Sequence, residues 1–396
     1  MMKTAIDHYR EATKMDNVEI WRLLKERALD STAEGVVISD CNQPDMPIIY
    51  VNNAFTAMTG YSWDEVVGKN CRILQGLDSD PAAAQDIRKA IKAQQPCKVE
   101  ILNYRKDGTQ FWNRLSITPV RDDQGRTTHF IGIQTDITRR REAEDALRSA
   151  NAQLKRDLQV AAQVQQSQLP KQLPETDTYR FAWRFKPCQE LAGDTLNISA
   201  LDDHRIAMYV LDVSGHGVQA ALQSFSLSQD LRPRDGGPDL GAPSQLLERL
   251  NMKYPMNMDT GMYFTILYGV LDVLSGDFTF AAAGHPGPVL IRCNGQPEMI
   301  AASAYPVGVS PKPDYQDQTL KLAPGDKLIL YTDGVVEALS SRDITFGEGR
   351  FLKALSKTAD KPIEECLDKV MKSLESWACH VNLRDDLSLI GIEAYM

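Results

Sequence analysis

The sequence lacks the features by which several classes of protein are recognised. No stretch approaches the ~18 uninterrupted apolar residues of a membrane-spanning helix, and the N-terminus has no apolar core of a secretion signal. The 7 cysteines are odd in number, widely scattered and never in a Cys-x-x-Cys pair, so neither a disulfide framework nor a zinc knuckle is indicated. We therefore expect a cytoplasmic protein from a reducing compartment, with no membrane partner.

An excess of positive charge is also missing. The 396 residues include 44 Lys and Arg against 53 Asp and Glu, which gives a formal net charge of −9. Nucleic-acid binding would need a local basic patch that this composition does not indicate, so we expect no nucleic-acid partner. A hydrophobic fraction of 43% excludes a disordered chain, and the length predicts two to three domains at ~150 residues each.

The pattern along the chain predicts an α+β multidomain protein in four segments. Residues 1–27 have apolar positions at helical spacing, typical of a helical cap. Residues 28–138 hold short β-rich runs separated by turn signals, which predict an antiparallel sheet with short helices. Residues 139–170 predict a long linker helix that ends at Pro170. Residues 180–396 alternate strand-like runs with helical segments near 216–231, 243–254 and 360–378, which predicts a β-sandwich with flanking helices.

The linker helix has an apolar repeat of seven. Leu147, Leu154 and Ala161 follow this repeat, and Asp157 interrupts the same side of the helix. A two-stranded coiled coil, and with it a homodimer, fits this pattern. A single helix packed against its own domain fits it as well.

Three carboxamides come together in the predicted first sheet. If residues 107–109 form a three-residue hairpin loop, Asn103 lies directly opposite Asn113. Symmetrical closure of the next loop places Gln134 opposite Asn113 on the other side. Neighbouring carboxamides offer both hydrogen-bond donors and hydrogen-bond acceptors.

The segment GKNCRILQG at residues 68–76, taken with these amides, resembles the signature of LOV domains, the flavin-binding blue-light sensors of the PAS superfamily. The resemblance covers roughly residues 28–138 and implies FMN as the cofactor. It assigns Cys71 as the thiol that adds to the flavin under blue light. It also implies flavin contacts for Asn70, Gln75, Asn103, Asn113 and Gln134, and phosphate contacts for Arg72 and Arg88.

This resemblance also implies a switch. Adduct formation protonates a flavin nitrogen, Gln134 turns its amide, and the strand leading into the linker helix is strained. Ile73 departs from the usual pattern, since an aromatic residue is common at this position. We expect this departure to change packing without removing the chemistry.

In the second half, aspartates recur at the ends of β-runs. They stand in the segments GD at 193–194, LDVSGHG at 211–217, TDG at 332–334 and RDD at 384–386. Carboxylates gathered from distant strand ends suit hard ions such as Mg²⁺ or Mn²⁺. Two such ions can activate a water molecule and hold a phosphoryl group.

The ordered motifs AGD, DVSGHG, YFTILYGVLD, AAGHPGP, YTDGVVEA and DDLSL resemble the SpoIIE-like branch of the PPM protein phosphatases, which have an α/β sandwich fold. The resemblance implies that Asp212 bridges two metal ions and that the Val213 carbonyl completes one shell. It implies further ligands in Asp194, Asp333 and Asp385, while Asp386 is the less favoured carboxylate of its pair. His216 and His285 stand in glycine-rich turns, where we expect them to be structural.

Together these resemblances predict a blue-light-regulated, metal-dependent protein serine/threonine phosphatase. They imply a phosphorylated anti-sigma-factor antagonist of the STAS type as its substrate. Asn197 replaces a carboxylate common in the family, so a pseudophosphatase that acts as a binding module is the alternative. A histidine kinase is disfavoured because the linker contains no histidine, and a transcription regulator because no basic recognition helix is present.

Overall fold

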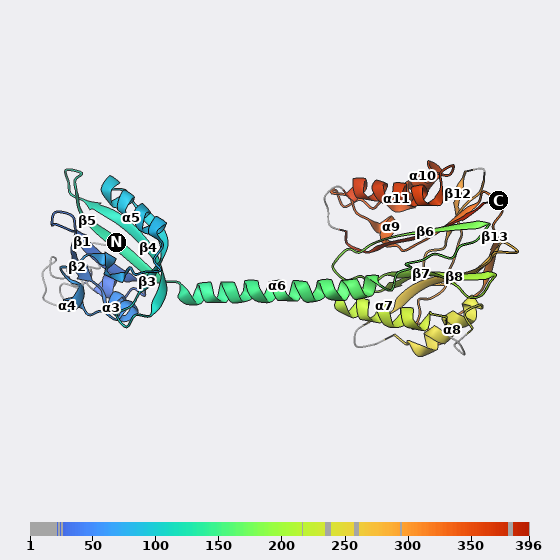
Figure 1. The fold of residues 1–396 in the computed structure, drawn as a ribbon, viewed down its shortest axis with the longest axis horizontal. Helices are drawn as coiled ribbons and strands as arrows, with labels where there is room; N and C mark the ends of the chain where they lie inside the picture. Colours follow the sequence, from blue (N-terminus) through green and yellow to red (C-terminus); the bar gives the residue numbers. More distant parts are fainter. Residues whose placement is uncertain are drawn as a thin grey trace, which may run out of the picture. The chain divides into compact units, whose positions relative to one another are not determined.

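The computed structural model describes residues 22, 24, 27–215, 217–233, 239–256, 261–293, 295–378 and 383–395. It divides into two compact units, Met1–Ala152 and Gln153–Met396, which are described separately below (Figure 1). No helix in these described ranges is long and apolar enough to cross a membrane. The predicted N-terminal cap lies almost entirely outside the described residues.

The first unit is an antiparallel sheet with short helices. Its five strands stand in the order β2-β1-β5-β4-β3. They are β1 (Gly35–Asp40), β2 (Ile48–Val51), β3 (Cys97–Tyr104), β4 (Gln110–Arg121) and β5 (Thr127–Asp136). Between β2 and β3 lie α3 (Asn53–Thr59), α4 (Trp63–Val66), the 3₁₀ turn η1 (Cys71–Leu74) and α5 (Pro81–Ala93). This arrangement confirms the predicted α+β fold of the sensor domain.

Helix starts in this unit follow from local chemistry. The Asn52 side chain accepts hydrogen bonds from the backbone N–H of Phe55, at the start of α3, and from that of Val36 in β1. Asp80 accepts from the N–H of Ala82 at the start of α5, where Pro81 has no N–H to satisfy. These caps fix α3 and α5 against the sheet.

The strand register differs from the predicted one by two residues. Asn103 lies opposite Phe111 and Asn113 opposite Ile101, while Gln134 lies opposite Leu115. The predicted Asn103–Asn113 pair was wrong because the β3–β4 turn is centred on Asp107, whose carboxylate accepts from the N–H and hydroxyl of Thr109. The predicted Gln134–Asn113 pair was wrong because the β4–β5 register shifts at an irregularity between Val120 and Arg121. A shift of two residues keeps every side chain on the same face, so the three amides remain diagonal neighbours.

The helix α6 (Thr138–Gln166) follows β5 and ends before Pro170, as the sequence predicts. None of its described side chains is buried. Leu147 is 63% and Leu154 58% exposed. These two residues of the apolar repeat have no cover in the single chain.

The second unit is a sandwich of two five-stranded sheets, as predicted. The orders are β13-β10-β9-β8-β7 and β12-β11-β14-β15-β6. The bounds are β6 (Tyr179–Lys186), β7 (Thr195–Ala200), β8 (Arg205–Val213), β9 (Phe264–Asp272), β10 (Asp277–Ala283), β11 (Val289–Ile291), β12 (Pro297–Met299), β13 (Gln318–Lys321), β14 (Lys327–Tyr331) and β15 (Leu387–Ala394).

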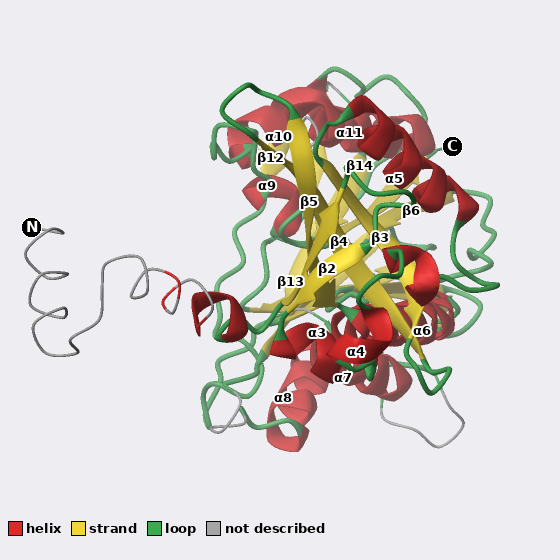
Figure 2. Ribbon diagram, turned by 90° about the vertical axis from the view of Figure 1, so that its left-hand side faces the viewer, coloured by secondary structure: helices red, strands yellow, loops and turns green. Residues whose placement is uncertain are grey.

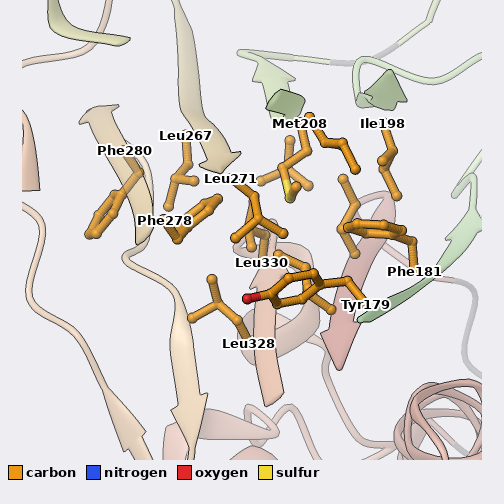
Figure 3. Packing of buried hydrophobic residues seen from close by; sticks show 14 of the residues in the cluster. Tyr179, Phe181, Ile198, Met208, Leu267, Leu271, Phe278, Phe280, Leu328 and Leu330 are labelled. Atoms are coloured by element: carbon orange, nitrogen blue, oxygen red, sulfur yellow. The ribbon is translucent and has the colours of Figure 1, made fainter. Parts of the chain in front are cut away.

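Helices cover both outer faces of this sandwich (Figures 1 and 2). On one side lie α7 (Val218–Asp230) and α8 (Pro243–Lys253), and on the other α9 (Gly334–Glu337), α10 (Gly347–Ser356) and α11 (Ile363–Ala378). The sequence did not predict α9 and α10. Between the sheets, side chains such as Phe181, Met208 and Leu330 form the core shown in Figure 3. This core holds the strand ends that carry the aspartates.

Candidate functional site

The first unit contains a cavity of about 770 Å³ between the sheet, η1 and α5. A volume of this size is typical of sites for drug-sized ligands. The residues predicted to contact a flavin all line this cavity: Asn70, Cys71, Arg72, Gln75, Arg88, Asn103, Asn113 and Gln134. Apolar side chains from β1, β4 and α5, among them Ile87 and Leu115, form the rest of the wall.

The three amides form one buried hydrogen-bonded group. The Asn113 Nδ2 donates to Asn103 Oδ1 at 2.9 Å and to Gln134 Oε1 at 3.2 Å. The Asn113 Oδ1 atom is buried and has no partner among the described residues. An unpaired buried acceptor costs ~1–3 kcal/mol, so this atom requires a donor from a ligand. An N–H at a flavin's pyrimidine edge supplies one, and the residues present therefore fit a flavin.

Cys71 lies at the start of η1, where the Asn70 side chain accepts from the Arg72 N–H at 3.0 Å. The Gln134 Nε2 lies 3.9 Å from the Cys71 Sγ. Burial raises the pKa of the Cys71 thiol to about 12. Because a thiolate is the usual nucleophile, the raised pKa favours the less nucleophilic protonated form of Cys71 at neutral pH.

Three cationic side chains line the cavity: Arg72, Arg88 and Lys92. Arg72 is 2.7 Å from the Asp45 carboxylate, and the Arg88 Nε donates to the Ala84 carbonyl at 3.1 Å. Lys92, one helical turn beyond Arg88 on α5, also lines the cavity. Lys92 is not among the residues predicted from the sequence, although its spacing of four residues from Arg88 was a usable signal.

The end of β5 is tied to the start of α6. The Asp136 carboxylate accepts from the Thr138 N–H at 2.9 Å and pairs with Arg105 at 2.6 Å. The Thr138 hydroxyl accepts from the Trp112 N–H at 2.9 Å. These contacts connect the end of β5 and the neighbouring strand β4 to the first turn of α6.

In the second unit, the predicted aspartates lie at neighbouring strand ends. Asp194 precedes β7 and is 2% exposed; it accepts from the Thr332 hydroxyl at 2.8 Å and from the Ser388 hydroxyl at 2.6 Å. Burial, and then the charge of Asp212, raises the pKa of Asp194. Thr332 and Ser388 were not found by sequence analysis, because a hydroxyl next to an aspartate motif has no distinctive pattern.

Asp212, at the end of β8, is the centre of this group of like charges. Burial raises its pKa, and the charges of Asp333 and Asp385 raise it further. Burial and the charge of Asp385 also raise the pKa of Asp333. The described residues contain no finished cluster of three or more metal-ligand side chains. Even so, buried carboxylates that raise one another's pKa repel each other when charged, and a divalent cation with a preference for oxygen ligands suits such a group.

Two further residues resolve questions left by the sequence. Asp386 accepts hydrogen bonds from the backbone N–H groups of Cys188 at 2.7 Å, Gly193 at 2.8 Å and Asp194 at 3.2 Å, so it shapes the turn that carries Asp194. Asn197 alternates with the core residues of β7 and lines a groove beside Arg232. Its side chain therefore faces away from the Asp194 carboxylate.

Comparisons with known proteins match both halves of the chain. Residues 33–139 match the family described as PAS domain, and residues 202–395 the family described as Stage II sporulation protein E (SpoIIE). Phototropin-2 of Oryza sativa is 50% identical over 112 residues, which are 28% of this chain and 12% of that protein. A blue-light-activated histidine kinase of Rhizobium johnstonii is 46% identical over 117 residues, 30% of this chain and 34% of that protein. This chain joins a LOV domain to a SpoIIE-type PPM phosphatase domain.

Solved structures are similar to each domain separately. The LOV domain of an Erythrobacter litoralis blue-light-activated histidine kinase is 46% identical, over 26% of this chain and 96% of that one, with a TM-score of 0.26. The SiaA-PP2C domain of Pseudomonas aeruginosa is 20% identical, over 62% of this chain and 98% of that one, with a TM-score of 0.54, which shows a shared fold. The chain spans about a third or less of the curated relatives above.

His285 has a structural environment in the phosphatase domain. Its ring lies 2.8 Å from the Thr265 hydroxyl and 3.0 Å from the Tyr331 carbonyl, and burial lowers its pKa to about 3. The neutral ring thus joins β9 to β14. His216 lies outside the described residues.

The last turn of α6 contacts the Asp194 loop within the phosphatase domain. The Gln165 side chain donates to the Ala192 carbonyl at 2.6 Å and accepts from the Ala192 N–H at 3.1 Å. It also donates to the Ser224 hydroxyl on α7 at 3.2 Å. Sequence analysis missed this residue, since one glutamine in a glutamine-rich helix has no distinguishing signal.

Proposed function

We propose that this protein is a blue-light-regulated, metal-dependent protein serine/threonine phosphatase. The observation that carries the proposal is one chain with two built sites. One is a cavity in which Cys71 lies beside three linked amides, and the other is a group of buried aspartates in a phosphatase fold. The helix α6 is the covalent connection between the two domains.

For light reception, a bound FMN supplies the absorption of blue light and the carbon to which a thiol adds. Asn103 and Asn113 would hold its pyrimidine edge, and Asn70 and Gln75 its polar chain. Arg72 and Arg88 would hold its phosphate, since guanidinium groups pair well with phosphate oxygens. Cys71 would hold its proton in the dark, because burial raises the pKa of its thiol.

For transmission, Gln134 is the first moving part. Its amide lies beside both Cys71 and Asn113, so a change of hydrogen-bonding partner at a bound flavin would turn this amide. Asp136 and Thr138 pass the resulting strain of β5 to α6. At the other end of the helix, Gln165 carries the signal to Ala192, two residues before Asp194.

For hydrolysis, two divalent ions, Mn²⁺ or Mg²⁺, supply an acidified water and a clamp for the phosphoryl oxygens. Asp212 would lie between the two ions, with Asp194, Asp333, Asp385 and the Val213 carbonyl as the remaining ligands. Thr332 and Ser388 hold the Asp194 carboxylate in place before any ion binds. The substrate would be a phosphoserine or phosphothreonine on a STAS-type anti-sigma-factor antagonist.

We assign the uncovered apolar repeat of α6 to a homodimer. Leu147 and Leu154 are more than half exposed and recur at seven residues. Burying such a stripe against a second copy removes apolar surface from water. A monomeric mass in solution at micromolar concentration would contradict the dimer.

The test of the proposed function compares phosphate-ester hydrolysis with Mn²⁺ in darkness and under blue light, in the wild type and in Cys71→Ala. We expect a light-dependent rate in the wild type and a rate fixed at its dark value in Cys71→Ala, which keeps the flavin but cannot form the adduct. Normal flavin bleaching with no hydrolysis of any phosphoprotein would instead support the pseudophosphatase. An unchanged photocycle in Cys71→Ala would refute the assigned thiol.

A further inference from the structure

The lining of the flavin cavity includes a cation in addition to the two predicted arginines. Arg72 has a carboxylate neighbour, because Asp45 lies 2.7 Å from it. Its positive charge is therefore largely offset before a ligand arrives. Of the two predicted phosphate partners, Arg88 is the one that forms no ion pair within the part of the chain that the structure describes.

Lys92 supplies the missing charge. It lies four residues after Arg88 on α5, so both side chains project from the same face of the helix, and both line the cavity. Within the described residues Lys92 forms no ion pair. The neighbouring Lys89, by contrast, pairs with Asp86 at 3.7 Å and is absent from the cavity wall.

The helix end gives a second reason for a cation here. Lys92 stands in the last turn of α5, where the backbone N–H of Gln94 caps the carbonyl groups of Ala90 and Ile91. The C-terminal end of a helix carries a partial negative charge that repels a phosphate. Lys92 lies in this turn and also lines the cavity, so its charge opposes that of the helix end.

We propose that Lys92 is a third phosphate-binding residue of the LOV domain and that it makes the cavity selective for a flavin with a terminal phosphate monoester. The net charge of this group is +2, because three cations, Arg72, Arg88 and Lys92, stand against one carboxylate, Asp45. A phosphate monoester carries between ~1.5 and 2 negative charges at pH 7, which this set balances. Without Lys92 the net charge of the group falls to +1. This inference rests on the proposed binding of FMN.

The test measures the dissociation constants of FMN and of riboflavin, which lacks the phosphate, on the flavin-stripped full-length chain. Lys92→Gln is compared with Lys89→Gln, a matched change on the same helix. We expect Lys92→Gln to weaken the binding of FMN about three- to tenfold and to leave the binding of riboflavin unchanged. We expect Lys92→Arg to restore FMN binding, and Lys89→Gln to change neither constant.

The salt dependence gives an independent readout. Adding 0.5 M NaCl screens a charge contact near the surface, so the difference between wild type and Lys92→Gln for FMN should shrink. Lys92 is exposed, and glutamine has a similar helix propensity, so the variant should keep its fold in a thermal unfolding scan.

Equal weakening of FMN and riboflavin in Lys92→Gln would overturn the proposal, because it would show a packing effect. The same loss of FMN binding in Lys89→Gln would also overturn the proposal, since the overall positive charge of α5, and not a contact of Lys92, would then explain the result. No loss of FMN binding in Lys92→Gln would do so as well. A wild-type chain that binds neither flavin would refute the proposed light reception itself, which separates the two failures.

Discussion

Replacing Gln165 by leucine should disconnect the linker helix from the phosphatase site. The substitution keeps the volume of the side chain and removes hydrogen bonds to Ala192 and Ser224. Each such bond contributes ~0.5–1.5 kcal/mol, and the Ala192 backbone, only 1% exposed, would be left without these partners. Together this is a loss on the order of 2–4 kcal/mol in the contact that holds the turn before Asp194.

The assay is a Mn²⁺ titration of phosphate-ester hydrolysis, in darkness and under blue light. Since 1.4 kcal/mol is a factor of ten, we expect the half-saturating Mn²⁺ concentration of Gln165→Leu to rise by about tenfold or more. We also expect the ratio of light to dark rates to fall toward one, which a purely structural defect would not produce. Flavin bleaching should remain normal.

Gln163→Leu is the matched control, because Gln163 lies one half-turn earlier on α6 with an exposed side chain. It should change neither the Mn²⁺ dependence nor the light response. If Gln165→Leu retained wild-type values for both quantities, Gln165 would not couple helix and site, and the route proposed for the signal would be wrong.

Other expectations follow from single residues of the two domains. Gln134→Leu cannot exchange a donor for an acceptor, so it should form the adduct, seen as loss of flavin absorption, with little light-dependent change in hydrolysis; full switching would show another signal route. Asp212→Asn removes charge between two ions that repel each other, so hydrolysis should be abolished at any practical Mn²⁺ concentration while bleaching stays normal; a near wild-type rate would refute the two-metal site. His285 has a pKa of about 3 when folded and 6.5 when unfolded, so the unfolded state binds more protons and stability falls as the pH drops below 6.5. The loss should be about 1.4 kcal/mol per pH unit. In His285→Gln, thermal unfolding between pH 6.5 and 5 should show a smaller loss than the wild type; an equal loss would contradict the neutral buried ring.

In the LOV domain, the sequence predicted correctly which residues share a face of the sheet. It did not predict correctly which residues lie directly opposite one another. Asn103, Asn113 and Gln134 line one cavity, although neither predicted pairing was correct. The face depends only on the parity of the register, which a shift of two residues preserves. The pairing depends on the turn and on bulges: the bonds between Asp107 and Thr109 lie in the β3–β4 turn, and the β4–β5 register shifts between Val120 and Arg121.

In the phosphatase domain, sequence predicted the aspartates but not the groups that hold them. Thr332 and Ser388 reach Asp194 from β14 and β15, more than a hundred residues away in the chain. Such contacts depend on how two sheets pack, which no local pattern encodes. The same holds for Lys92, whose importance depends on the cavity that α5 helps to form.

The position of the Asn197 side chain bears on the choice between a phosphatase and a pseudophosphatase. The sequence suggested that this asparagine depletes one metal shell, because it stands three residues after Asp194. On a strand, however, residues three apart project to opposite faces, and β7 follows this rule, with Leu196 and Ile198 in the core and Asn197 in the groove beside Arg232. The substitution therefore leaves the charges around Asp194 and Asp212 unchanged. This removes the argument for a degenerate site that was based on Asn197. Asp194→Asn is then expected to raise the half-saturating Mn²⁺ concentration, because it would be the first loss of negative charge among the proposed ligands of that ion. A variant with wild-type Mn²⁺ dependence would show that Asp194 is not a ligand.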